Sequence, residues 1–280
     1  MKICAIADSH GFLVDIPKCD LFIIAGDISW DNNYKWFKDT FIKYLIRQKP
    51  NYDKCIIVFG NHDDNIFMGN DNIRDGLPKY VSILENSYCY YKRFKIYGTS
   101  ASKYLPSFKN TYLEPKLRDI YSKIPNDTDI LVTHSPPYGI GDSIKTTNPL
   151  DWHEHLGSVS LLERVREVKP KLHIFGHIHT GNKYTRENGT DYFNVSITNE
   201  DYDIAYIPTI IEINKEDINM NMYYCPTCKK PARKITTIET EVPHRHLVWN
   251  GEFYAVVDSN DDQIKTNTYC GICKTLIKSE

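Results

Sequence analysis

Short apolar runs alternate with helical stretches over the first 213 residues. Runs such as DLFIIAGD and KCIIVFGN are continuously apolar rather than alternating, which is typical of strands covered on both faces. Strands covered in this way need another layer on each face, so the pattern predicts a layered α/β fold with sheets sandwiched by helices. The expected strands are 2–8, 20–27, 54–61, 94–100, 129–135 and 171–177, followed by β segments at 193–198 and 207–213.

Two helices are predicted between these strands. Residues 33–49 carry apolar side chains near a helical period, and a proline follows them. Ser160 and Glu163 have the spacing of a capping box, which predicts the start of a second helix. This helix is expected to end near Val168 because Pro170 cannot continue it.

The composition changes after residue 213. Residues 214–221 are polar and predict a linker, and residues 222–280 carry two C-x-x-C pairs separated by strand-like stretches. In a cytosolic protein such pairs favour metal binding over disulfides, so we expect one structural zinc in a small zinc-ribbon-like β domain. The zinc would stabilise a segment too short to bury a large core. Its expected ligands are four thiolates, those of Cys225, Cys228, Cys270 and Cys273.

The charge balance excludes some functions and leaves others open. Lysine and arginine number 34 against 36 acidic residues, so no global basic excess predicts nucleic-acid binding. Basic residues follow Cys228, and they fit either a nucleic-acid patch or, as we favour, a solvated face. No apolar run reaches the ~20 residues of a membrane helix. Asp8 and His10 interrupt the first apolar run, so we expect no signal peptide and a cytosolic location.

Side chains that can bind metals follow five of the predicted strands. In α/β proteins, ligands bind at the carboxyl ends of strands. Each fragment alone fits a capping residue or a solvated loop histidine, whereas five in this order predict a metal centre. His177 and His179 alternate along an extended segment, so both side chains can face one cavity. The full set is Asp8, His10, Asp27, Asn61, His62, His134, His177 and His179.

These motifs resemble the calcineurin-like metallophosphoesterase superfamily, whose pattern is D-x-H, G-D, G-N-H-D/E, H and G-H-x-H. The resemblance covers residues 1–213 and implies a four-layer α/β/β/α metallophosphoesterase sandwich, followed here by the zinc-ribbon-like domain at 222–280. It implies that Asp27 bridges two metals and that His62, not a ligand, contacts the substrate phosphate and protonates the leaving oxygen. It implies that three residues hold the first metal: Asp8, His10 and His179. Three others hold the second: Asn61, His134 and His177.

The donor set suits several metals. Imidazoles favour Zn, Fe, Ni or Mn, and carboxylate and amide oxygens broaden the choice toward Mn. Two ions ~3.5–4 Å apart need an anion between them, and a hydroxide that bridges them would attack phosphorus in line. We therefore expect two divalent ions in the active site (Mn, Fe, Zn or Ni), and hydrolysis without a covalent enzyme intermediate.

The motifs also bear on the substrate. Protein Ser/Thr phosphatases carry G-D-x-x-D-R-G and G-N-H-E, whereas residues 26–32 read GDISWDN and the second motif ends in Asp63, which argues against that branch. Residues 133–139 look like the T-H-G-P-P stretch of the superfamily. Residues 161–165 and 169–179, and also 94–98 and 193–196, are similar to the metallophosphoesterase-domain phosphodiesterases of animal brain, in the branch of the class III cyclic-nucleotide phosphodiesterases. Some of those replace the residue matching His177 by Gly and lose activity, so the histidine here implies an active enzyme.

We predict a phosphodiesterase acting on a small nucleotide, cyclic nucleotides included, or a related phosphoester. Segments 64–92 and 101–127 are expected to be loops that set specificity. Three alternatives stay open: a phosphomonoesterase or protein phosphatase, a nuclease that grips its substrate with the C-terminal segment, and a non-catalytic scaffold. Scaffolds of this fold typically lack ligands, and none is missing here. The sequence carries no signal for the oligomeric state.

Overall fold

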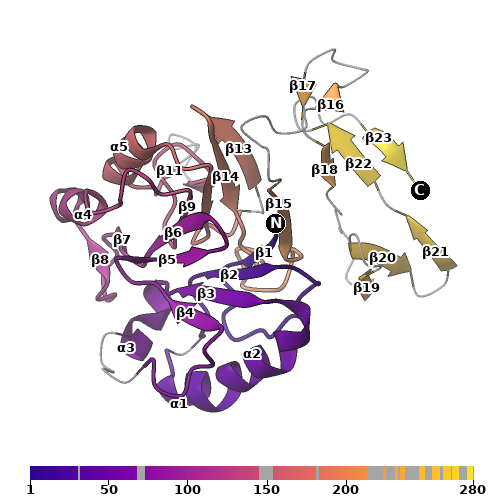
Figure 1. Cartoon of the computed structure of the whole chain (residues 1–280), viewed down its shortest axis with the longest axis horizontal. Helices are drawn as coiled ribbons and strands as arrows, with labels where there is room; N and C mark the ends of the chain where they lie inside the picture. Colours follow the sequence, from indigo (N-terminus) through magenta and orange to yellow (C-terminus); the bar gives the residue numbers. More distant parts are fainter. Residues whose placement is uncertain are drawn as a thin grey trace. The chain divides into compact units, whose positions relative to one another are not determined.

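The computed structural model describes residues 1–30, 32–67, 73–144, 154–180 and 183–213, and beyond them the backbone of eight strands (Figure 1). Two compact units make up the chain. One is Lys2–Ile211, and the other is Glu212–Glu280 together with Met1. Within the described ranges, no helix has both the length and the apolar character needed to cross a membrane.

The first sheet of the unit Lys2–Ile211 has the strand order β15-β1-β2-β3-β4. Strands β1 to β4 pair in parallel. Every residue of β2 is buried, as its uninterrupted apolar sequence LFIIA predicts. The strand bounds are β1 (Lys2–Ile6), β2 (Leu21–Ala25), β3 (Lys54–Val58), β4 (Val81–Ile83) and β15 (Thr209–Glu212).

The second sheet has the order β13-β14-β12-β9-β6-β5. Its four inner strands are parallel, and an antiparallel strand closes each edge. The strand bounds are β5 (Ser87–Tyr91), β6 (Phe94–Thr99), β9 (Ile130–Thr133), β12 (Leu172–Phe175), β13 (Lys183–Glu187) and β14 (Thr190–Asn194). Smaller pairs are β7 (Ser102–Lys103) with β8 (Thr111–Tyr112), and β10 (Ser143–Ile144) with β11 (Glu154–His155).

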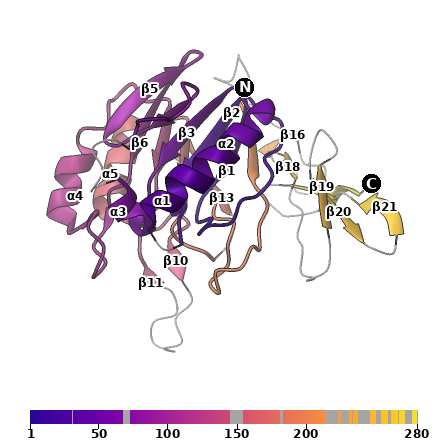
Figure 2. The same cartoon turned by 90° about the horizontal axis from the view of Figure 1, so that it is seen from below.

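Helices cover the outer face of each sheet. Figure 2 shows α1 and α2 in front of β1 to β3, where Phe37 and Phe41 join the core under the first sheet. Helices α4 and α5 pack on the second sheet. The inner faces approach closely, because a Cβ atom on Gly98 of β6 would lie 2.7 Å from the side chain of Val58 on β3. The helices are α1 (Tyr34–Trp36), α2 (Ile42–Gln48), α3 (Asp64–Phe67), α4 (Glu114–Tyr121) and α5 (Val159–Val168).

The α/β class and the two sheets confirm the sequence prediction, with local differences. The helix expected at 33–49 is present, but a π-helical turn at Phe37–Phe41 divides it. The strand expected at 193–198 lies at Thr190–Asn194 instead. The segments expected to be loops at 64–92 and 101–127 contain α3, β4, β5, β7, β8 and α4.

The predicted capping box of α5 is wrong. Ser158 rather than Ser160 caps this helix, since the Ser158 hydroxyl accepts a hydrogen bond from the Leu161 N–H at 3.2 Å. The Ser160 hydroxyl instead donates to the Glu114 carbonyl oxygen of α4, at 3.3 Å. Ser160, which the spacing had assigned to the cap, therefore joins α5 to α4 instead.

The unit Glu212–Glu280 contributes short antiparallel strands. The predicted linker at 214–221 and the side chains of all four predicted zinc ligands lie outside the described residues, which include only the backbone of Cys270. The zinc site and the domain boundaries therefore stay predictions. The strands are β16 (Tyr223–Tyr224), β17 (Pro231–Ala232), β18 (Lys234–Thr236), β19 (His246–Trp249), β20 (Tyr254–Asp258), β21 (Asp261–Lys265), β22 (Asn267–Cys270) and β23 (Leu276–Ser279).

Candidate metal centre

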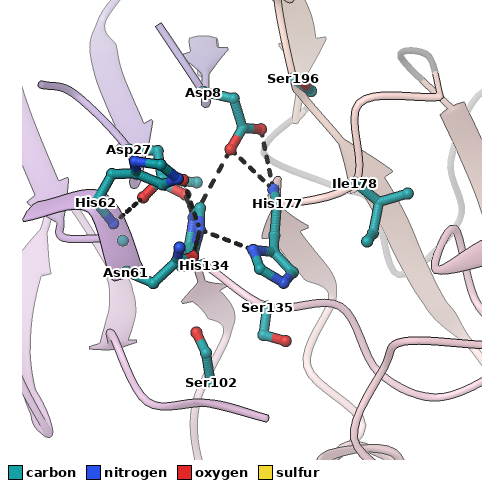
Figure 3. Close-up of polar contacts among 12 residues, drawn as sticks. Asp8, Asp27, Asn61, His62, Ser102, His134, Ser135, His177, Ile178 and Ser196 are labelled. Carbon is teal, nitrogen blue, oxygen red and sulfur yellow. Dashed lines mark hydrogen bonds and ion pairs between the residues drawn. The ribbon is translucent and has the colours of Figure 1, made fainter. Parts of the chain in front are cut away.

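Loops at the carboxyl ends of five strands bring the predicted active-site residues together (Figure 3). The first sheet supplies the loops after β1, β2 and β3, and the second sheet supplies those after β9 and β12. Parallel strands end at a common edge, so residues far apart in the chain meet there. The eight residues are those predicted, namely Asp8, His10, Asp27, Asn61, His62, His134, His177 and His179.

One group of ligand atoms comes from Asp8, His10 and His179. The atoms of these three side chains all lie within 4.8 Å of one another. The His179 Nε2 atom is 3.6 Å from the Asp8 Oδ1 atom and 3.4 Å from the His10 Nε2 atom. These are the three residues predicted to hold the first metal.

A second group comes from Asp27, His134 and His177, again within 4.8 Å. The His134 Nε2 atom lies 3.3 Å from the Asp27 Oδ2 atom and 3.2 Å from the His177 Nδ1 atom. The Asn61 Oδ1 atom is 2.9 Å from the same His134 nitrogen. The four donors thus surround one position, as expected for a second metal with a shared carboxylate.

Asp27 also belongs to a third group, with His10 and His62. The Asp27 Oδ2 atom is 3.9 Å from the His10 Nε2 atom, so the same oxygen faces both of the other groups. This position suits the predicted bridging role. The third group also places a ring nitrogen of His62 within 4.8 Å of the other two ligand atoms, close enough to act as a ligand.

Two backbone carbonyls fix the orientation of ligand imidazoles. The His134 Nδ1 atom is 2.9 Å from the Ala25 carbonyl oxygen, and the His179 Nδ1 atom is 3.1 Å from the Asn199 carbonyl oxygen. A carbonyl oxygen only accepts, so each Nδ1 carries a proton, and Nε2 is the ring atom left to bind a cation in place of a proton. Imidazole nitrogens and carboxylate oxygens that face the same position can together bind a cation.

The pKa values of the cluster indicate the same need for positive charge. Burial opposes charging of His134, but Asp27 and Asp8 outweigh it and raise the pKa of that imidazole to about 9. A bare cluster would therefore draw a proton to the place where a cation fits. Burial would likewise raise the pKa of the Asp27 and Asp8 carboxyls, yet the neighbouring histidines hold both below the ordinary value.

Other histidines stay neutral and able to donate a lone pair. Burial is the main reason that the pKa of His10 falls to about 4. The pKa of His177 also falls to about 4, through burial and then through the nearby His134. Neutral imidazole is the form that binds metals, so both rings are already in the protonation state that a metal ligand needs.

The backbone turns sharply at the ligands. Asp8, His10, Asp27 and His177 have φ angles of 55°, 40°, 50° and 71°, in the left-handed region. Asp and His enter this region more readily than bulkier residues do, although it costs free energy. Close approach adds a second constraint, because a Cβ atom on Gly26 would lie 2.2 Å from the His134 Nδ1 atom.

Backbone N–H groups hold the carboxylates. The two Asp8 oxygens accept from the His177 N–H at 3.0 and 2.9 Å, and Asp27 Oδ1 accepts from the His62 N–H at 2.8 Å. The buried Asp63 carboxylate accepts from the N–H groups of Ile28, Ser29 and Gly60. Burial and then Asp27 raise the pKa of Asp63 to about 7. Asp63 therefore connects the second and third ligand loops.

Residues 1–181 match the family model described as calcineurin-like phosphoesterase. The chain belongs to the calcineurin-like phosphoesterase family. This confirms the family that the motifs predicted.

Several proteins are similar to this calcineurin-like phosphoesterase over most of the chain. The UPF0046 protein T07D4.2 of Caenorhabditis elegans is 30% identical over 246 residues, which cover 76% of this chain and 60% of that protein. Metallophosphoesterase domain-containing protein 1 of Homo sapiens is 27% identical over 246 residues, covering 76% of this chain and 71% of that protein. The crystal structure of TT1561 of Thermus thermophilus has a TM-score of 0.49 at 15% identity, covering 69% of this chain and 88% of that one.

Sequence reasoning missed the aromatic rings beside the histidines of this calcineurin-like phosphoesterase. The Tyr202 ring lies 4.8 Å from that of His10, and Phe108 lies 5.0 Å from His62. Trp30 is 5.9 Å from His10. Tyr202 sits in a polar stretch with no periodic pattern, so no sequence signal places it there. Phe108 lies in a segment that was expected to affect specificity, but nothing singled out this residue.

Proposed function

We propose that this calcineurin-like phosphoesterase hydrolyses phosphoester bonds at a centre of two divalent cations. We further propose that it acts as a phosphodiesterase on a small nucleotide, cyclic nucleotides included, or a related phosphoester. One observation carries the proposal: three groups of ligand atoms are linked, because the group with His62 shares His10 with the first group and Asp27 with the second. Overlapping groups are what two neighbouring cations with a common carboxylate need.

The residues of the chain would bind the cations, orient the ligand imidazoles and exclude water from the site. When bound, the two cations supply the charge that activates water and polarises the phosphoryl oxygens. The Ala25 and Asn199 carbonyls keep two ligand imidazoles in the metal-binding tautomer. Most of the proposed ligands are buried, which strengthens electrostatic interactions within the site. The proposed first set is Asp8, His10, Asp27 and His179, and the second is Asp27, Asn61, His134 and His177.

His62 is the proposed general acid. Its backbone N–H donates to Asp27, while its ring is half-buried between the rings of His10, at 4.9 Å, and Phe108, at 5.0 Å. The ring can therefore reach a phosphoryl group at the centre while keeping a side toward solvent. A histidine so placed can donate a proton to the leaving oxygen.

Replacing His62 by Ala is expected to slow hydrolysis by roughly 10²–10⁴-fold while leaving the metal content unchanged. The loss should be smaller for a p-nitrophenolate leaving group, which needs no protonation, than for an alkoxide. His62→Asn serves as a matched variant, since it keeps a polar side chain that cannot donate a proton in this way. Steady-state rates on both kinds of ester, with metal analysis, check the result. Loss of metal in His62→Ala would instead make this histidine a ligand.

The proposed function is tested with the full chain and added Mn²⁺. Hydrolysis of bis-p-nitrophenyl phosphate is expected, and cyclic nucleotides, mononucleotides and phosphoproteins then define the substrate in several metals. A chain that binds metal but hydrolyses none of these would be a scaffold. Preference for monoesters would make it a phosphomonoesterase, and salt-sensitive affinity for DNA or RNA would favour a nuclease.

We also propose one structural zinc in the C-terminal segment, bound by the four cysteines predicted from the sequence. Replacing Cys270 by Ser in the full chain is expected to remove one zinc per chain, because thiolates select zinc over manganese. Cys89→Ser is the matched control, since Cys89 lies half-buried on β5 and belongs to no C-x-x-C pair. Metal analysis of both variants checks this. Disulfides in place of free thiols at the four positions would contradict the zinc site.

A further inference from the structure

Two aromatic rings form a wall on one side of the metal centre. The Tyr202 ring lies 4.8 Å from the His10 ring and 5.0 Å from the His179 ring. Trp30 meets Tyr202 at 5.2 Å and His10 at 5.9 Å, both in edge-to-face geometry. We call Trp30 and Tyr202 the aromatic wall. It borders the histidines that are proposed to hold the first metal.

Trp30 is largely exposed to solvent. The residue is 60% exposed, and among the described residues its ring contacts are those with His10 and Tyr202. Tryptophan is usually well buried, so a largely exposed one beside a polar catalytic centre marks a surface suited to contact with a ligand. The edge-to-face contacts leave much of the indole free for stacking.

The backbone holds Tyr202 in an unusual conformation. Its φ angle is 63°, in the left-handed region that bulky side chains rarely adopt. The Asn199 side-chain oxygen accepts from the N–H groups of Asp201 and Asp203, at 3.0 and 2.9 Å. The Tyr202 N–H donates to the Asn199 carbonyl oxygen, at 2.9 Å, and the same oxygen orients His179. One turn thus orients a proposed ligand and fixes the backbone that carries the tyrosine ring.

The backbone that leads into Trp30 is anchored on the other side. The two residues that precede it, Ile28 and Ser29, donate their N–H groups to the buried Asp63 carboxylate. The Ile28 carbonyl oxygen also accepts from the Gly11 N–H at 2.8 Å, which ties this segment to the loop that carries His10. The wall is therefore built on the ligand loops themselves.

We propose that Trp30 and Tyr202 bind a planar aromatic ring of the substrate, either a nucleobase or an aryl group, while its phosphoryl group lies at the metal centre. The inference rests on the proposed function, and it specifies which chemical group of the phosphoester substrate the enzyme recognises. Stacking on an aromatic side chain is tolerant of ring identity, so both sources of the ring fit. Exposed acidic residues beside Tyr202, namely Glu200, Asp201 and Asp203, disfavour a second phosphate and so a polyanionic substrate.

The test compares ligands that differ only in the aromatic ring. Phosphonates are suitable because their P–C bond resists hydrolysis, so binding can be measured by calorimetry on the Mn²⁺-loaded full chain. One pair is phenylphosphonate and methylphosphonate. The other is the 5′-methylenephosphonate of adenosine and that of ribose. The aromatic member of a pair should bind roughly 5- to 150-fold more tightly.

Trp30→Ala should bring that ratio close to one without changing the affinity for methylphosphonate, and Trp30→Phe should retain most of it. Tyr90→Ala is the matched control, because Tyr90 is 62% exposed on the edge strand β5. A preference confined to the adenosine pair would show that the aromatic wall binds a nucleobase. A preference in both pairs would show that it binds aromatic rings in general.

Two results would overturn the inference. One is equal affinity within both pairs for the wild-type chain, and the other is a Trp30→Ala variant that weakens both members equally. Turnover of bis-p-nitrophenyl phosphate separates this failure from that of the proposed function. If the chain hydrolyses the diester but shows no preference for the aromatic ligands, only the inference about the aromatic wall is refuted. If it neither hydrolyses the diester nor binds any phosphonate, the proposed function is refuted as well.

Discussion

Asp27→Asn is expected to abolish turnover and to lower the occupancy of both cation positions. The Asp27 Oδ2 atom faces His10 at 3.9 Å and His134 at 3.3 Å, so it lies between the two groups of ligand atoms. An amide of the same shape removes the negative charge that two cations share. We expect the rate to fall by more than roughly 10³-fold, beyond the loss of a single electrostatic contact.

Metal analysis and steady-state rates on the full chain check this prediction. The matched control is Asp191→Asn, which neutralises another buried carboxylate, in β14 and outside the groups of ligand atoms. The control should keep both metals and a near-normal rate. An Asp27→Asn variant that retains two metals, or a normal rate, would refute the bridging role.

Gly26→Ala is expected to disrupt the centre although it replaces none of the proposed ligands. Its Cβ atom would lie 2.2 Å from the His134 Nδ1 atom and 2.9 Å from the Gly60 Cα atom, so the ring or the backbone must move. The φ angle of 99° adds conformational strain. We expect the free energy of unfolding to fall by about 2–5 kcal/mol and the rate to fall by at least about 10²-fold.

Gly189→Ala separates strain from crowding. Gly189 has a φ angle of 89°, yet a Cβ atom there would meet nothing within 4 Å. This control should lose only about 1–2 kcal/mol of stability and keep its activity. Denaturant unfolding and rates on the same diester compare the two variants. Equal effects in both would show that the contact with His134 is unimportant.

The strand ends could be predicted from the sequence because their signal is local. Apolar runs that stop at Asp8, Asp27, Asn61, His134 and His177 predict both the strands and the place where their carboxyl ends meet. The side chains come together because β1 to β3 are parallel in one sheet, and β9 and β12 are parallel in the other. Topology alone therefore collects the candidate ligands.

What sequence could not predict depends on contacts between distant segments. The Asn199 carbonyl that orients His179 and the turn that presents Tyr202 carry no local pattern. The cap of α5 was misplaced for the same reason, since Ser160 makes its contact with α4. The regular structure within the expected loop segments was missed too, because α4 has only eight residues and its apolar face is short.

The left-handed backbone of four proposed ligands has an evolutionary consequence. Each such residue costs on the order of 1 kcal/mol or more, so Asp8, His10, Asp27 and His177 together forgo several kcal/mol, a substantial part of the net stability of a domain. Glycine would relax the backbone at every one of these positions, so the metal-binding role proposed for the four side chains gives a reason for the strain. A lineage released from catalysis should therefore gain stability by drifting to glycine here first. Reconstructed or designed descendants without the proposed metal centre would record that release in these four residues, while the sheets beneath them stay unchanged.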